Sequence, residues 1–170
     1  MIRIVYTASN TLFGKVIRYL TNSKVSHVMI QYSSDLWGGE WVAEATLPMV
    51  CKMPAEKARR NVVTEFECLF DAKPALHAIR DEIGKWYDFK LIFGLGFILM
   101  LWKFLKIKIR RPLGNSKGDI CSEFVAKFYK AAKLPNSGNI VPSRYYPELS
   151  LNYNLAYPEL FKQIDVAKTS

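Results

Sequence analysis

The chain has 170 residues, of which 50% are hydrophobic and 14% aromatic, so it can bury a real core and is not a disordered polypeptide. We expect one domain over residues 1–170. Its 24 Lys and Arg against 15 Asp and Glu give a net charge of +9, which favours anionic partners such as a membrane surface, a nucleic acid or an acidic polymer. Its three cysteines are widely spaced without a CxxC pair, which argues against a disulfide framework or a zinc site.

The first third of the chain predicts a strand, a helix and a β-hairpin. Apolar residues alternate through MIRIVYTA, around Arg3 and Tyr6, as in a strand. Asn10 or Thr11 is placed to cap a short helix, TLFGKVIRYLT, whose apolar side chains fall on one face: Leu12, Val16, Ile17 and Leu20. The runs KVSHVMIQY and EWVAEAT flank a polar loop with two glycines, which predicts an antiparallel hairpin.

The remainder of the chain predicts a third strand and at least two helices. The run NVVTEFECLF alternates as a strand does. From Pro74, apolar residues recur at helical spacing through PALHAIRDEIGKWY. A later helix contains GDICSEFVAKFY and ends near Leu134, and a tail with VPSRYYPEL closes the domain. These elements predict an α+β fold.

The most apolar segment runs from Leu91 to Trp102 and is followed by a basic stretch that ends at Arg111. Twelve apolar residues are too few to cross a bilayer, which needs about 20. We interpret the segment, extended to Leu105, as a buried helix, with membrane-surface contact as the alternative. The basic residues of Lys103–Arg111 favour a solvated edge strand or loop, since edge strands carry lysines. The alternative is a headgroup-facing patch, which makes Leu91–Arg111 a candidate surface for an anionic membrane. No nucleic-acid-binding motif accompanies it, so no specific nucleic acid is expected.

The N-terminus indicates where the protein acts. It has no basic segment followed by an apolar run and a small-residue cleavage site, the pattern of a secretory signal. We therefore expect a cytoplasmic protein, with association with a membrane or a virion as the alternative.

Cys121 is a candidate nucleophile because it lies just inside the predicted start of a helix, with Asp119 placed to cap it. Free amides and the helix dipole at that position both favour a thiolate. The alternative is a buried structural cysteine, since Cys121 shares a helical face with Val125 and Phe128.

His27 is the candidate base, because an imidazole inside the apolar strand VSHVMI needs a polar partner. If paired residue numbers in the hairpin sum to 71, Gln31 faces Glu40 and His27 faces Glu44. Opposed side chains have Cβ atoms about 5 Å apart, so Glu44 could orient His27 and hold it cationic beside a thiolate. A buried His–Glu hydrogen bond without a catalytic role is the alternative.

Two further residues have polar groups that could reach a site. His77 lies off the apolar face of its predicted helix, so we expect it at the surface. Tyr87 ends that helix and either presents its hydroxyl to a cleft or packs in the core.

Five pieces of the chain resemble the circularly permuted NlpC-type cysteine amidases and peptidases of the papain-like superfamily, in particular the YiiX-like branch. They are FGKVIRYLTNSKVSHVMI, EWVAEAT, GKWYDF, GDICSEFVAKFY and VPSRYYPEL. The resemblance implies a permuted papain-like fold, with an antiparallel sheet packed against a central helix that carries the cysteine at its N-terminus. It also implies Cys121 as nucleophile, His27 as base and acid, Glu44 as the residue that orients His27, and Tyr87 as a substrate or oxyanion contact.

The resemblance implies a hydrolase that cleaves amide or peptide bonds through an acyl-enzyme, without a metal or other cofactor. Its substrate would be a peptide, a muropeptide or an N-acyl or lipid molecule. Relatives of this branch include lecithin retinol acyltransferase-like enzymes, so a lipid-directed acyltransferase or thioesterase is one alternative. A non-catalytic structural domain that keeps the fold is the other.

Overall fold

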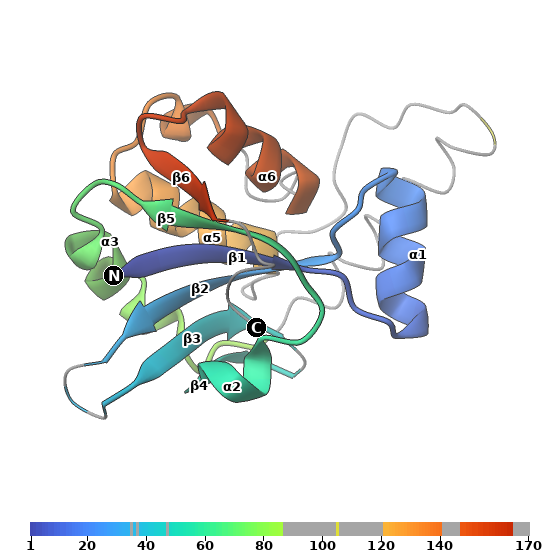
Figure 1. The fold of residues 1–170 in the computed structure, drawn as a ribbon, viewed down its shortest axis with the longest axis horizontal. Coiled ribbons are helices and arrows are strands. Elements are labelled where there is room, and N and C mark those ends of the chain that lie inside the picture. Colours follow the sequence, from blue (N-terminus) through green and yellow to red (C-terminus); the bar gives the residue numbers. More distant parts are fainter. Residues whose placement is uncertain are drawn as a thin grey trace.

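A six-stranded antiparallel sheet organises the protein (Figure 1). The computed structural model describes residues 1–34, 36, 38–46, 48–86, 105, 121–140 and 147–164. Across the sheet the strands follow the order β4-β3-β2-β1-β5-β6. Their bounds are Ile2–Thr7 (β1), His27–Ser33 (β2), Glu40–Ala45 (β3), Val50–Pro54 (β4), Val62–Cys68 (β5) and Phe161–Ile164 (β6).

The helices are short and surround this sheet, which makes the fold α+β, as the sequence predicts. Figure 1 shows α5 running behind the central strands, while α1 stands at one end of the sheet. The α-helices are Leu12–Thr21 (α1), Ala55–Ala58 (α2), Lys73–Ala78 (α3), Cys121–Ala131 (α5) and Pro147–Ala156 (α6), with 3-10 turns at Arg80–Glu82 and Ser137–Asn139.

The two faces of the sheet differ in size and chemistry because side chains alternate along each strand. The α5 face carries the main core, in which strand residues such as Ile4, Tyr6 and Phe66 pack against Phe124 and Phe128. The opposite face has a small apolar cluster under α2, formed by Val5, Met29, Val42 and Ala55. Elsewhere on that second face the strands carry polar side chains.

A buried set of hydrogen bonds attaches α5 and α6 to the first strand. The Tyr6 hydroxyl lies 2.8 Å from Ser150 Oγ and accepts from Asn154 Nδ2 at 2.9 Å. Tyr129 of α5 donates to Asn154 Oδ1 at 2.7 Å. Because every one of these side chains is fully buried, each partner offsets the desolvation of the others, and α5 is held in a fixed position on the sheet.

The β2–β3 register differs from the predicted one. Ser33 pairs with Glu40 and Ile30 with Ala43, so paired numbers sum to 73, and the prediction of 71 is wrong. Between the two strands, Ser34 N donates to Gly39 O at 3.0 Å, and Gly38 and Gly39 have φ of 66° and 71°. A shift of two residues leaves every side chain on its predicted face, whereas a shift of one would not.

The helix predicted from Pro74 is shorter than expected. The α-helix α3 ends at Ala78, and Trp86, placed on the apolar face of the predicted helix, is 69% exposed and forms an isolated bridge with Met49. Gly84, at a φ of 91°, donates its N–H to Val50 O at 2.8 Å. The segment around Gly84 and Trp86 therefore pairs with the start of β4 instead of continuing the helix.

Of the other secondary-structure predictions, some are confirmed and some fall outside the described residues. The first strand, the helix capped by Thr11 and the helix that carries Cys121 are confirmed. Strands β4 and β6 and helices α2 and α6 were not predicted, since short elements carry little periodicity. The apolar segment from Leu91, apart from Leu105, and the basic stretch up to Arg111 lie outside the described residues, as do Asp119 and Tyr87.

Candidate functional site

His27 is fixed by the backbone that leads into β2. Ser26 donates its N–H to Thr7 O at 2.9 Å, and its hydroxyl accepts from Ser9 N at 2.9 Å. His27 itself is paired with Thr7 across the β1–β2 ladder. The imidazole therefore projects from a defined position at the end of two central strands, where it keeps 19% of its side chain exposed.

Glu44 of β3 contacts His27 directly. Glu44 Oε2 lies 2.6 Å from His27 Nε2, and the Glu44 side chain is only 8% exposed. In the observed register the two residues are diagonal neighbours rather than opposed, a geometry that long side chains can span. Gln31 and Glu40 repeat the same diagonal contact, with Gln31 Nε2 donating at 2.9 Å. The predicted contact is thus present despite the wrong register.

Cys121 reaches the same histidine from the other layer of the fold. It is the first residue of α5, is 5% exposed, and α5 packs against β2 and β3. Burial by itself lowers the pKa of His27, but the charge and hydrogen bond of Cys121, then the hydrogen bond and charge of Glu44, raise it from 6.5 to about 10. Since Nε2 serves Glu44, Nδ1 is the ring nitrogen left for the thiol.

A cleft of about 600 Å³ opens beside this histidine. It lies where β1, β2 and β3 meet the start of α1 and the segment after α2. Most of its lining residues carry hydroxyl, amide or charged groups, and its described lining is Thr7, Ser9, Asn10, Thr11, Gly14, Ile17, Ser26, His27, Met29, Glu44, Ala45, Thr46, Ala58, Arg60 and Asn61. The cleft therefore borders the imidazole and the carboxylate directly, while Cys121 is not among its lining residues and adjoins it through His27.

The other two cysteines have environments that disfavour a thiolate. Burial, then the charge of Glu67, raises the pKa of Cys68 to about 12. Burial, then the charge of Glu44, raises the pKa of Cys51. Both are free thiols, so they provide internal references for the reactivity of Cys121.

Of the remaining residues considered at the sequence level, His77 lies away from the cleft. His77 lies on α3 and is exposed, as predicted, and it does not line the cleft beside His27. Within the described ranges, no three His, Cys, Asp or Glu side chains are grouped so as to hold a metal ion. The same described part of the chain contains no helix with the length and apolar character needed to cross a bilayer.

Sequence reasoning missed Arg60 and Asn61, which bring the segment after α2 to the cleft. No periodicity predicted α2, a helix of four residues, so the hydrophobic pattern gave no indication that the segment after it would approach His27. The left-handed Asn61, at a φ of 54°, is the one local signal, because asparagine adopts that conformation more readily than most residues.

No protein-family model matches the chain, and a comparison with curated proteins finds no match either.

Proposed function

We propose that the protein is a cysteine-dependent hydrolase that cleaves amide or peptide bonds through an acyl-enzyme. The observation that carries the proposal is His27, which contacts Glu44 at 2.6 Å and interacts with the Cys121 thiol beside a cleft of about 600 Å³. A nucleophile, a base and an acid that orients the base form the arrangement used in covalent catalysis.

In the proposed acylation step, the Cys121 thiolate attacks the substrate carbonyl carbon, and the carbonyl oxygen takes the negative charge. In this proposal the amide of Cys121, in the first described turn of α5, donates to that oxygen, since the first N–H groups of a helix have no partner within the helix. His27, protonated in the resting pair, then gives its proton to the leaving nitrogen as the C–N bond breaks.

In the deacylation step, neutral His27 takes a proton from water, and the resulting hydroxide adds to the thioester carbonyl. Collapse of that adduct breaks the C–S bond and releases the carboxylic acid, the Cys121 thiolate and protonated His27. In this scheme Glu44 fixes the ring orientation and stabilises the imidazolium by accepting from Nε2, which leaves Nδ1 as the nitrogen free to serve the thiol.

A lipid-directed acyltransferase or thioesterase is the second candidate, and one observation favours it. Leu12, Val16 and Tyr19 lie along one side of α1 and are 80%, 44% and 56% exposed, next to the cleft that Gly14 and Ile17 of the same helix line. An exposed apolar stripe on a helix with basic neighbours suits a lipid surface. The covalent chemistry would be the same, with a second acyl acceptor in place of water.

The test is acetylation of the protein by p-nitrophenyl acetate, followed by intact and peptide mass spectrometry. We expect an acetyl group on Cys121 that forms quickly and turns over in the parent protein. The Cys121→Ser variant should lose it, and His27→Ala should form it more slowly and retain it longer. Cys51→Ala is the matched control and should behave as the parent. If Cys121 is acetylated no faster than Cys51 and Cys68, the protein is a non-catalytic structural domain.

A further inference from the structure

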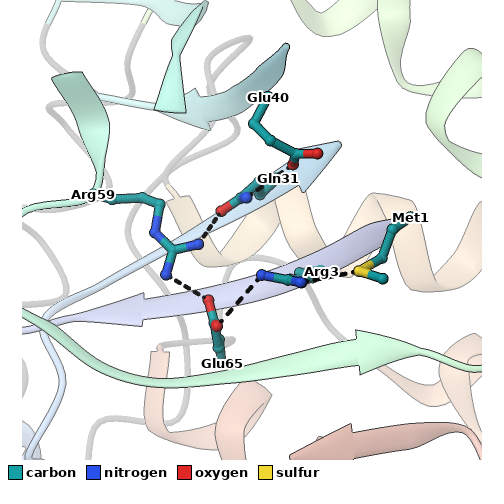
Figure 2. Close-up of polar contacts among 6 residues, drawn as sticks. All are labelled: Met1, Arg3, Gln31, Glu40, Arg59 and Glu65. Carbon is teal, nitrogen blue, oxygen red and sulfur yellow. Dashed lines mark hydrogen bonds and ion pairs between the residues drawn. The ribbon is translucent and has the colours of Figure 1, made fainter. Parts of the chain in front are cut away.

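Two consecutive arginines follow α2 and have opposite environments. Arg59 is directed over the face of the sheet, where its guanidinium lies 2.8 Å from Glu65 Oε2 and donates to Gln31 Oε1 at 2.7 Å (Figure 2). Arg60 is exposed and lines the cleft beside His27. The first arginine is therefore part of the fold, while the second is available to a ligand.

The segment that carries Arg60 is held at both ends. Arg59 is anchored through Glu65, a fully buried side chain that Arg3 also approaches at 3.5 Å (Figure 2). On the other side, Ala8 donates its N–H to Asn61 O at 3.0 Å, which ties the segment to the residues that follow β1. Arg60 itself donates its N–H to Ala58 O at 2.8 Å. The Arg60 side chain thus extends from a backbone that is fixed on the cleft wall.

Arg60 supplies a positive charge that the described protein leaves uncompensated. Its guanidinium has no ion pair or side-chain hydrogen bond within the described residues. Glu44, the acidic residue among the described lining, is already engaged by His27 at 2.6 Å. The same cleft is also lined by hydroxyl and amide groups, including those of Asn10, Thr46 and Asn61. This set suits a polar, negatively charged ligand.

We propose that Arg60 binds an oxyanion of the substrate, so that the substrate class is an amide or ester that carries a carboxylate or phosphate group near the bond to be cleaved. A guanidinium presents donors in a planar fork that matches either group. The inference rests on the proposed function, since it takes the cleft beside His27 as the substrate site. Arg60 is a substrate-binding residue in this scheme and has no part in proton transfer.

The charge preference of Cys121 alkylation tests this role. Rates with anionic iodoacetate and neutral iodoacetamide are compared at one ionic strength, with Cys121 located by mass spectrometry. We expect Arg60→Gln to lower the iodoacetate-to-iodoacetamide rate ratio at least threefold while the iodoacetamide rate stays unchanged. Arg60→Lys should keep most of the ratio. Lys57→Gln, which removes an exposed charge from α2 outside the cleft lining, is the matched control and should not alter it.

A second measurement does not depend on the thiol and separates the two sources of the oxyanion. Acetate and inorganic phosphate are titrated into the parent and Arg60→Gln proteins while the backbone amide signals of Asn61 and Thr46 are followed by NMR. Saturable shifts with one anion, lost in Arg60→Gln, identify a carboxylate or a phosphate. If neither anion shifts these signals in the parent, or if the shifts survive in Arg60→Gln, the proposal is overturned. A slow Cys121 with normal anion binding would instead count against the hydrolase alone.

Discussion

Two pairs of oppositely charged side chains lie on the same face of the sheet, and they are similarly buried. His27 and Glu44 are 19% and 8% exposed, while Arg59 and Glu65 are 20% and 0% exposed. The histidine lines a cleft, and the pair that includes Glu65 does not. Burial therefore does not distinguish a candidate site from a structural ion pair in this protein.

The difference lies in the cation. A guanidinium does not lose its proton in a protein, so Arg59 can only hold Glu65 and fix the chain. An imidazole can lose its proton, and the Cys121 thiol beside His27 is a group with which that proton can be exchanged. The comparison teaches that a charge pair is a candidate for chemistry only where one member titrates and a nucleophile and a cleft adjoin it.

The largest expected effect concerns the structural pair. Glu65→Ala should lower the free energy of unfolding by about 3–5 kcal/mol, because it leaves Arg3 and Arg59 partly buried without their counter-charge. Within the described residues the carboxylate oxygens of Glu65 have ion-pair contacts but no hydrogen bond of good geometry, so its role is charge compensation. Urea unfolding at pH 7.5 measures the loss.

The matched variant in the other pair is Glu44→Ala, for which we expect a smaller loss of about 1–3 kcal/mol. His27 can respond to the loss of Glu44 by releasing its proton, a response that the arginines beside Glu65 do not have. Equal losses in the two variants would contradict the distinction between a titrating and a permanent cation.

The second prediction concerns the protonation of His27. Its pKa is raised to about 10, so its ring should remain protonated at pH 8, where an ordinary histidine is neutral. In Cys121→Ala the charge and hydrogen bond of Cys121 are lost while burial still lowers the pKa, so the titration midpoint should fall. NMR of the ring C–H signals, assigned with His27→Gln, follows the change. An unchanged midpoint would mean that the thiol does not interact with His27.

The third prediction uses the position of Glu44 between two cysteines. Burial raises the pKa of Cys51, and the charge of Glu44, which pairs with Cys51 across β3 and β4, raises it further. Glu44 also contacts His27. Glu44→Gln should therefore speed iodoacetamide alkylation of Cys51 and slow that of Cys121 several-fold in the same sample. Cys68, whose pKa is raised by burial and Glu67, is the control and should not change. Changes of the same sign at Cys51 and Cys121 would indicate a general loosening of the fold.

The sequence allowed the central part of this site to be predicted. An isolated histidine in an apolar strand needs a polar partner. Side chains alternate between the two faces of a hairpin, so a register error of two residues keeps Glu44 on the face of His27, and Glu44 could still be named. The cleft could not be predicted in the same way. Its wall at Arg60 depends on an α2 helix of four residues and on a buried Arg59–Glu65 contact between separate elements, neither of which leaves a periodic pattern.

The smallest expected effect comes from a third pair, which lies at the surface. Lys85 Nζ is 2.7 Å from Glu82 Oε1, but the Lys85 side chain is 42% exposed, and Glu82 also contacts Lys127. Water solvates Lys85 in either state and Glu82 keeps a cation, so Lys85→Met should change the free energy of unfolding by less than about 1 kcal/mol. Urea unfolding beside Glu65→Ala measures both on one scale. A loss as large as that of Glu65→Ala would mean that desolvation of the remaining charge is not what makes the buried pair costly to break.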